Sequence, residues 1–165
     1  MSDLPQYPQD AADREAAAPA PGAGRDFASW GSRVAAYLLD TLILLVPLAI
    51  LFVIVIAADP GDTSAAWGAL GLAYLATLVL PFVYFTVLHG NERGQTVGKR
   101  ALGIRVVGDE SGESIGYGRA LGRYAITFVF GIVVIPILLD YLWPLWDQKN
   151  QALHDKVVGS VVVRA

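Results

Sequence analysis

Two long stretches without a charged side chain dominate the hydrophobic pattern of the chain. The first continues for 18 residues between Asp40 and Asp59, and the second covers residues 63–88. A helix of about 20 apolar residues spans the hydrocarbon core of a bilayer. The pattern therefore predicts two membrane-spanning helices, over about residues 30–58 and 65–88, which a tight loop joins into a helical hairpin.

A third apolar segment, at about residues 122–146, is interrupted by Pro136, Asp140 and Pro144. As one helix it would cross the bilayer and leave the carboxyl terminus on the far side. If it breaks near Pro136, each half of about 11 residues reaches only about 16 Å, so the chain would enter the membrane and return. We favour the return.

Two short sequences outside these segments are strand-like. LGIRVV, at residues 102–107, is followed by the turn-forming residues GDESGES, so it could form a small local hairpin or a bent strand. The terminal sequence GSVVVRA could instead pair with LGIRVV if both lie on the same side of the membrane. The expected fold is thus an all-α membrane protein with a small strand-like cytoplasmic loop.

The distribution of basic residues predicts the orientation. The predicted loop at residues 59–65 has two aspartates and no Lys or Arg, whereas Arg33 precedes the first span. Four further basic residues follow the second span, namely Arg93, Lys99, Arg100 and Arg105. Because cytoplasmic loops carry an excess of positive charge, we expect the amino terminus and residues 89–123 to be cytoplasmic.

The first 26 residues differ in composition from the remainder. They are rich in Pro, Ala, Gly and acidic residues, which predicts a disordered cytoplasmic tail ahead of a membrane domain at residues 27–165. The tail lacks the basic region and short apolar core of a secretory signal, so we expect the first apolar segment to stay in the mature protein.

Composition excludes several classes of protein. Hydrophobic residues make up 55% of the chain and charged residues 16%, against about 25% charged in soluble domains, so the excess apolar surface is expected to face lipid. A net charge of −3 gives no basic field for nucleic acid, and the absence of cysteine excludes disulfides and thiolate metal sites.

Arg33 and Asp40 are candidates for a polar network. Seven residues place them on nearly the same helix face, about 10 Å apart along the axis, so we expect no contact between them. Arg33 could simply extend to the lipid headgroups. A carboxylate within a membrane helix requires a partner. Asp40 could form a structural ion pair, with Arg119 or Arg123, or serve as a cation or proton site.

Asp147, His154 and Asp155 form a second candidate group, because on a helix they would share a broad face. A histidine beside an aspartate could form a pH-responsive pair. Helix capping, or an ion pair with a basic residue of the 93–105 segment, is the alternative. No three-ligand spacing suits zinc, so we expect no metal site.

The sequence GNERGQTVGKRALGIRVV, at residues 90–107, is glycine-rich and basic but is not a phosphate loop. Only three residues separate Gly94 from Gly98, and Arg100 stands where a Ser or Thr would bind magnesium. We interpret the segment as a cytoplasmic interface in which Lys99, Arg100 and Arg105 attract anionic headgroups. Its candidate residues are Gln95, Gly98, Lys99, Arg100 and Arg105. With no nucleophile and base pair, no hydrolase motif and no cofactor cradle, we expect neither an enzyme nor a cofactor.

Four ordered blocks resemble the RDD family of bacterial integral membrane proteins: RVAAYLLD, GQTVGKRALGIRVV, GRALGRY and QALHDKVVGSVVV. The resemblance covers residues 27–165. It implies that Arg33 and Asp40 are the arginine and the first aspartate of the family name, and that Asp155 is the second. It also implies a multi-pass protein of the bacterial plasma membrane, and cation/proton exchange has been proposed for some members.

Two functions follow as hypotheses. In the first, the protein is a small cation/proton antiporter, assembled as a homo-oligomer, in which Asp40 alternately binds a proton and a cation while Arg33 and the Asp155 group control access. In the second, it is a non-transporting membrane anchor or accessory module that binds a partner protein through residues 89–123 and its carboxyl terminus.

Overall fold

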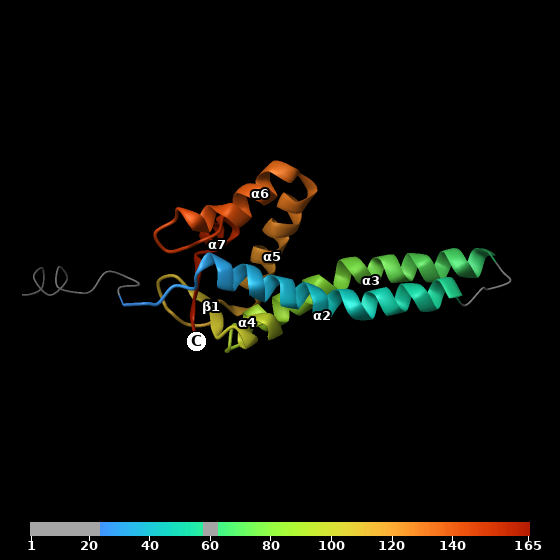
Figure 1. Cartoon of the computed structure of the whole chain (residues 1–165), viewed down its shortest axis with the longest axis horizontal. Coiled ribbons are helices and arrows are strands. Elements are labelled where there is room, and N and C mark those ends of the chain that lie inside the picture. Colours follow the sequence, from blue (N-terminus) through green and yellow to red (C-terminus); the bar gives the residue numbers. More distant parts are fainter. Residues whose placement is uncertain (1–23, 58–62) are drawn as a thin grey trace, which may run out of the picture.

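Two long helices form one end of the molecule. A computed structural model describes residues 24–57 and 63–165. Helix α2 (Trp30–Ala57) and helix α3 (Thr63–Gly90) lie side by side and project from a smaller body that holds the other elements (Figure 1). Only 11% of the most apolar window of each helix is buried within the chain. The two predicted helices are confirmed, and their apolar side chains face outward.

The third apolar segment is two helices. Helix α5 (Gly116–Ile132) and helix α6 (Val134–Leu142) meet at Val133, whose extended backbone, with φ −121° and ψ 124°, ends the first helix. The two helices pack against each other, so the chain reverses direction. A single helix over residues 122–146 is therefore wrong.

The favoured break, predicted near Ile135 and Pro136, is confirmed slightly earlier in the chain, at Val133. Pro136 is the third residue of α6, in the first helical turn, where the missing proline N–H would have had no partner within the helix. Pro144 lies in the short 3₁₀ helix η1 (Trp143–Leu145) that follows α6. Both prolines are thus placed where helices tolerate them.

A two-stranded sheet joins the middle of the chain to its carboxyl end. Strand β1 (Ile104–Gly108) pairs antiparallel with strand β2 (Ser160–Arg164), and Val106 lies opposite Val162 at the centre. The predicted pairing of the two sequences is confirmed, and the fold is mostly helical rather than all-α. The local hairpin is wrong, because β1 pairs with β2 from the carboxyl end and the residues after β1 lead into helix α5 (Gly116–Ile132).

The sheet carries the hydrophobic core on both faces. On one face, Ile104, Val106 and Val162 pack with small residues of α2 and α5, Ala36 and Ala120. The other face buries Val107, Val161 and Val163 against Phe27. Because side chains alternate along a strand, five residues in each strand are enough to serve both clusters. The core therefore fixes the first turns of α2 and α5 relative to the sheet.

The chain just before α2 is held on the sheet. The backbone N–H of Ala28 donates to Val162, and Arg25 donates to the carbonyls of Gly108 and Asp109 at 3.2 and 2.5 Å. Residues 1–23 of the predicted tail and residues 58–62 of the predicted loop lie outside the described residues.

Two short helices each precede a strand. Helix α4 (Val97–Ala101) leads into β1, and helix α7 (Leu153–Val157) leads into β2. Gly103 and Gly159, with φ of +63° and +61°, turn the chain from helix to strand in each case. These conformations favour glycine, because a Cβ atom is strained there.

Candidate functional site

Asp40 joins three elements through one carboxylate. Its Oδ1 accepts hydrogen bonds from the Tyr84 hydroxyl of α3 and the Gly98 N–H of α4, each at 2.7 Å, and its Oδ2 accepts one from the Thr96 hydroxyl at 2.6 Å. The side chain is buried. No cationic group in residues 24–57 and 63–165 lies within ion-pair distance of it. Neutral donors therefore hold this carboxylate in place.

The proposed ion pairs of Asp40 with Arg119 or Arg123 are wrong. Arg119 donates to the backbone carbonyls of Val158 and Gly159, and Arg123 forms an ion pair with Asp155. The physical reason is that α4 packs directly on α2. The hydroxyl of Thr96, which caps α4, and the Gly98 N–H therefore occupy the carboxylate of Asp40.

Gly98 allows this close packing. A Cβ atom at this position would lie 2.1 Å from the backbone oxygen of Ala36 and 2.9 Å from the Asp40 carboxyl carbon. No larger residue fits without separating α4 from α2. Gly98 is thus a packing residue as well as a hydrogen-bond donor, a role that its spacing from Gly94 did not reveal.

Asp155 is the centre of a buried ion triad. Its Oδ2 accepts from Arg33 Nη1 of α2 at 2.7 Å, and its Oδ1 forms an ion pair with Arg123 Nη2 of α5 at 2.8 Å. The same two oxygens also accept from the Ser160 hydroxyl at 3.0 Å and from the Ala152 N–H at 3.1 Å. Arg33 and Asp40 accordingly bind different partners, and Arg33 is not directed to the headgroups.

Charges decide the protonation of Asp155. Burial by itself raises the pKa of this carboxyl, but the positive charges of Arg123 and Arg33, together with His154, outweigh it. The net result holds the pKa well below its usual range. The carboxylate therefore stays ionised, and it balances only one of the two guanidinium charges that contact it.

Asp140 of α6 binds the neighbouring histidine. Its Oδ2 lies 2.6 Å from His154 Nδ1, and its Oδ1 accepts from the His154 backbone N–H at 2.8 Å. On the far side of the ring, Arg123 Nη2 lies 3.1 Å from His154 Nε2. Because a guanidinium only donates, Nε2 accepts and the ring proton sits on Nδ1, facing Asp140.

Lys99 points into the molecule. Its Nζ donates to His89 Nε2 at 2.7 Å, beside the end of α3. Burial and the nearby charge of Arg123 lower the pKa of Lys99 to about 7. Lys99 does not lie on the outer surface as expected, because α4 turns its side chain toward the body of the protein.

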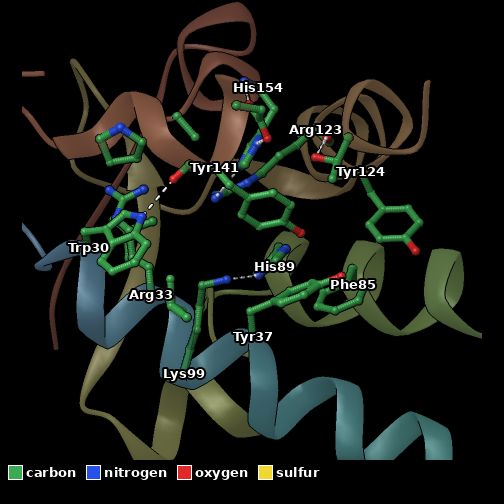
Figure 2. A pocket seen from close by; sticks show the side chains of 16 residues that line it. Trp30, Arg33, Tyr37, Phe85, His89, Lys99, Arg123, Tyr124, Tyr141 and His154 are labelled. Carbon is green, nitrogen blue, oxygen red and sulfur yellow. Dashed lines mark hydrogen bonds and ion pairs between the residues drawn. The ribbon is translucent and has the colours of Figure 1, made fainter. Parts of the chain in front are cut away.

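A cavity of about 100 Å³ lies among these charged groups. Arg33, Lys99 and Arg123 enter it from three sides, with His89 and Tyr141 beside them (Figure 2). Phe85, Tyr124 and Pro144 contribute apolar wall, and the half-exposed rings of Trp30 and Tyr37 lie where the cavity meets the surface. The site is therefore a cavity lined by basic side chains and by aromatic rings.

Three donor atoms of the two arginines that line this cavity have no partner within the described parts of the chain. They are Nε and Nη2 of Arg33 and Nη1 of Arg123. The Arg123 side chain is 7% exposed and the Arg33 side chain 12% exposed. Buried polar groups ordinarily have a hydrogen-bond partner. These three arginine donors lack one among the described residues, whereas the oxygens of the nearby carboxylates are all hydrogen-bonded.

The remaining predicted residues do not line the cavity. Asp147 precedes α7 instead of sharing a helix with His154, and it pairs with Lys156 and caps the Gln151 N–H. Burial opposes ionisation of Asp147, but these bonds outweigh it and lower its pKa. The expected pairing with residues 93–105 is therefore wrong for Asp147.

Within the predicted interface motif, the residues have different positions. Gln95 donates to the Ile104 carbonyl at 3.0 Å and so supports the turn into β1. Arg105 lies in β1 opposite Val163, and Arg100 is exposed. Only Arg100 and Arg105 remain available for contact with headgroups.

Sequence reasoning gave Arg123 the wrong partner, and it noticed Asp140 only as an interruption of the third apolar segment. Asp140 is a lone acid in an apolar segment, and this cost alone required a partner. Arg123 occurs in the GRALGRY block, next to the apolar run. His89, Tyr84 and Thr96 gave no signal of this kind, because their roles depend on the packing of α3 and α4 on α2. Across residues 24–57 and 63–165, no group of three His, Asp or Glu side chains is arranged to hold a metal ion.

Comparison with known proteins identifies relatives. The sequence matches the model of the RDD family over residues 27–159. It is 36% identical over 70 residues to a protein named Proline-rich antigen homolog of Mycobacterium tuberculosis, a match that covers 42% of this chain and 28% of that protein. The chain thus spans less than a third of the length of this relative.

Two relatives in Bacillus subtilis match over most of their length. The uncharacterized protein YxaI is 28% identical over 145 residues, which cover 79% of this chain and 93% of that one. The uncharacterized protein YckC is 29% identical over 140 residues, which cover 81% and 82% of the two chains. No solved structure is significantly similar to this chain.

Proposed function

Because the chain belongs to the RDD family, we propose that it is an integral membrane protein that holds a ligand-binding cavity at one end of two membrane-spanning helices. The observation that carries this proposal is the position of the cavity. Arg33, Tyr37 and Phe85, which line it, belong to the same two helices whose apolar side chains face outward further along. The cavity would then open at the membrane interface.

The exposed surface of α2 and α3 supports insertion of these helices into lipid. Val53, Ile56, Trp67 and Leu72 are 65%, 72%, 73% and 70% exposed, respectively. At about 25 cal/mol per Å², such a surface is unfavourable in water and favourable in a bilayer. The exposed apolar side chains of these two antiparallel helices also offer a contact for a second copy of the chain, and we propose a homo-oligomer on this basis.

The reversal between α5 and α6 supports a membrane-dipping hairpin. Its tip consists of Ile132, Val133, Val134 and Ile135, which are between 53% and 72% exposed. We propose that this tip enters the same leaflet as the cavity and that the chain returns to the side of the sheet. With the charge asymmetry of the loops, this side would be the cytoplasm and the membrane the bacterial plasma membrane.

Extraction and labelling test this proposal. The chain has no cysteine, so single cysteines can be introduced at Ile56, near the far end of α2, and at Arg100, beside the cavity. We expect the protein to resist alkaline extraction from bacterial membranes. A membrane-impermeant maleimide should label the Arg100→Cys variant only after the cells are opened. Release of the wild-type chain into the alkaline supernatant would contradict membrane insertion, and labelling of Arg100→Cys in intact cells would reverse the orientation.

A cation/proton exchanger is a second candidate, favoured by the Asp140 and His154 pair. The pair faces the cavity, and its proton lies between two titratable groups. Asp40, the predicted exchange site, has both oxygens occupied by three neutral donors. In proteoliposomes with a sodium or potassium gradient, this candidate predicts proton movement that is lost in Asp140→Asn. Equal fluxes in wild type and Asp140→Asn would exclude it.

The partner-binding alternative gains no specific support from the packing. Much of the 89–123 segment is used internally, since Lys99 faces the cavity and β1 pairs with β2. Its exposed remainder includes Arg100. We therefore place the function in the cavity.

A further inference from the structure

In the part of the chain that the structure describes, the buried side-chain nitrogen atoms without a partner, on the two arginines that line the cavity, are all donors. Nε and Nη2 of Arg33 and Nη1 of Arg123 have no acceptor within the described residues, and the Lys99 ammonium has one neutral acceptor, His89. An ammonium carries three N–H groups, so Lys99 can donate to further oxygen atoms. A ligand that satisfies these groups must present several acceptors.

The acidic groups nearby are not available to a ligand. Asp140 is the one carboxylate among the described lining residues, and both its oxygens are engaged by His154. Asp155 is behind the two arginines, where both its oxygens are engaged by Arg33, Arg123, the Ser160 hydroxyl and the Ala152 N–H. A metal cation would therefore meet two guanidinium groups, the Lys99 amine and no free carboxylate oxygen.

The triad itself leaves a positive charge. Arg33 and Arg123 carry one charge each, whereas Asp155 supplies one negative charge between them. Guanidinium groups match the oxygens of phosphate and carboxylate groups. Here the donors approach from α2, α4 and α5, that is, from three directions (Figure 2). A carboxylate offers two oxygens in one plane, whereas a phosphate group offers at least three around a tetrahedron.

We infer that the cavity binds a tetrahedral oxyanion of the phosphate type, with Arg33, Arg123 and Lys99 as its ligands. This inference rests on the proposed function, because it names the ligand of the same cavity. The volume of about 100 Å³ is several times the roughly 10–15 Å³ that a cavity needs to hold one water molecule, and it accommodates such a group. The group is either a free anion or the phosphate of a lipid headgroup.

The aromatic wall fits the lipid source equally well. Phe85 is buried and Tyr37 is 42% exposed, so an apolar path leads from the charged end of the cavity to the outward-facing side of α2. A headgroup bound at the arginines could extend its glycerol part along these rings. The chemistry at the arginines is the same for both sources, and the experiment must separate them.

The test uses the full chain purified in a maltoside detergent, which contains no phosphate. Inorganic phosphate and a short-chain phosphatidylglycerol are titrated separately by calorimetry, with chloride as the reference anion. We expect saturable binding of at least one probe, weakened about tenfold or more in Lys99→Gln, because one charged hydrogen bond is lost. The matched variant Arg100→Gln removes an adjacent but exposed charge and should bind as the wild type does.

A second pair of variants avoids any change of charge. Val34 lines the cavity, whereas Val46 of the same helix is 54% exposed. Val34→Phe should fill the cavity and abolish binding, and Val46→Phe should leave it unchanged. If Lys99→Gln or Val34→Phe fails to fold, its cooperative unfolding transition will be missing. Oxyanion binding by the other variant then tests the inference.

The outcomes separate the two sources and the two proposals. Binding of inorganic phosphate alone assigns a free anion, and binding of phosphatidylglycerol alone assigns a headgroup. Binding of neither probe, or equal affinity in wild type, Lys99→Gln and Val34→Phe, overturns the inference. Alkaline extraction of the wild type reports separately on the proposed function, since a chain that stays in the membrane but binds no oxyanion contradicts only the ligand.

Discussion

Asp40 and Asp140 lie in different helices, yet each accepts a hydrogen bond from the second residue of a short helix. The Gly98 N–H of α4 donates to Asp40 at 2.7 Å, and the His154 N–H of α7 donates to Asp140 at 2.8 Å. Each short helix then passes through a glycine with positive φ into one of the two paired strands. The body is therefore built from two similar units of a helix, a glycine turn and a strand.

This similarity separates two roles for the acids. Asp40, at α4, accepts hydrogen bonds from neutral donors only. Asp140, at α7, binds His154, which in turn contacts Arg123. The first unit is suited to packing α4 on α2. The second unit faces the cavity, so we expect substitutions in this unit, and not in the first, to change ligand binding.

Substitution of Asp40 tests the packing role. In Asp40→Asn, the new amide group cannot accept from all three donors, so a buried hydroxyl or N–H loses its partner. We expect the free energy of unfolding to fall by about 1–3 kcal/mol, measured by denaturant unfolding in detergent. Asp26→Asn, at a side chain that is 73% exposed, is the control. A loss of oxyanion binding with unchanged stability would show that Asp40 belongs to the ligand site instead.

Gly98 provides a steric test of the same contact. In Gly98→Ala the added Cβ would lie 2.1 Å from the Ala36 oxygen, so α4 must shift away from α2. We expect destabilisation of about 1–3 kcal/mol, typical of overpacking. Gly71→Ala, where nothing lies within 4 Å, should be neutral or slightly stabilising, because alanine favours the helix. Equal unfolding midpoints for the two variants would contradict the close packing of α4 on α2.

The sequence predicted the elements better than their contacts. Long uncharged runs identified α2 and α3, and the valine-rich ends of LGIRVV and GSVVVRA indicated the strands. The break predicted near Pro136 occurs at Val133, a few residues earlier, because a proline in the first turn of a helix does not itself interrupt it.

The charged site was predictable only in part. Arg33, Asp40 and Asp155 stand out by residue type and position, but their partners depend on how α4, α5 and α7 pack around α2. The predicted pair of Asp40 with Arg123 shows the difficulty. Both residues are buried and required partners, yet Arg123 binds Asp155, which lies 32 positions later in the chain.

Neutralising Asp155 should destabilise the protein strongly. Asp155→Asn leaves Arg33 and Arg123 close together without a counter-charge, and breaking a buried ion pair in this way costs about 3–5 kcal/mol. Glu113→Gln, at an exposed position outside the triad, is the control. We expect the loss to appear as a lower unfolding midpoint in detergent. A variant with wild-type stability would mean that water, and not Asp155, compensates the arginines.

Acidification gives a second test of the triad. The folded state lowers the pKa of Asp155 below its ordinary value of 3.8, so the unfolded chain takes up this proton first as the pH falls. Asp155 therefore contributes its full stability above about pH 5, and this contribution decreases progressively below that value. The wild-type unfolding midpoint should fall more steeply between pH 5 and 3 than that of Asp155→Asn. Parallel curves would contradict an ionised Asp155 in the folded state.

Lys99 has the opposite dependence on pH. Its pKa is lowered from 10.5 to about 7 by burial and by Arg123, so between these values the unfolded chain binds a proton that the folded chain lacks. Stability should consequently rise from pH 7 to about pH 10, and Lys99→Gln should flatten this rise. Arg100→Gln should retain it.

A bound oxyanion favours the charged form of the Lys99 ammonium, so the affinity for the anion should be highest below pH 7 and decrease as the pH rises through 7. Sulfate, whose charge is constant over this range, isolates the effect of the protein. Affinity for sulfate that is independent of pH between 6 and 8.5 would exclude Lys99 as a ligand of the anion, even if the arginines bind it.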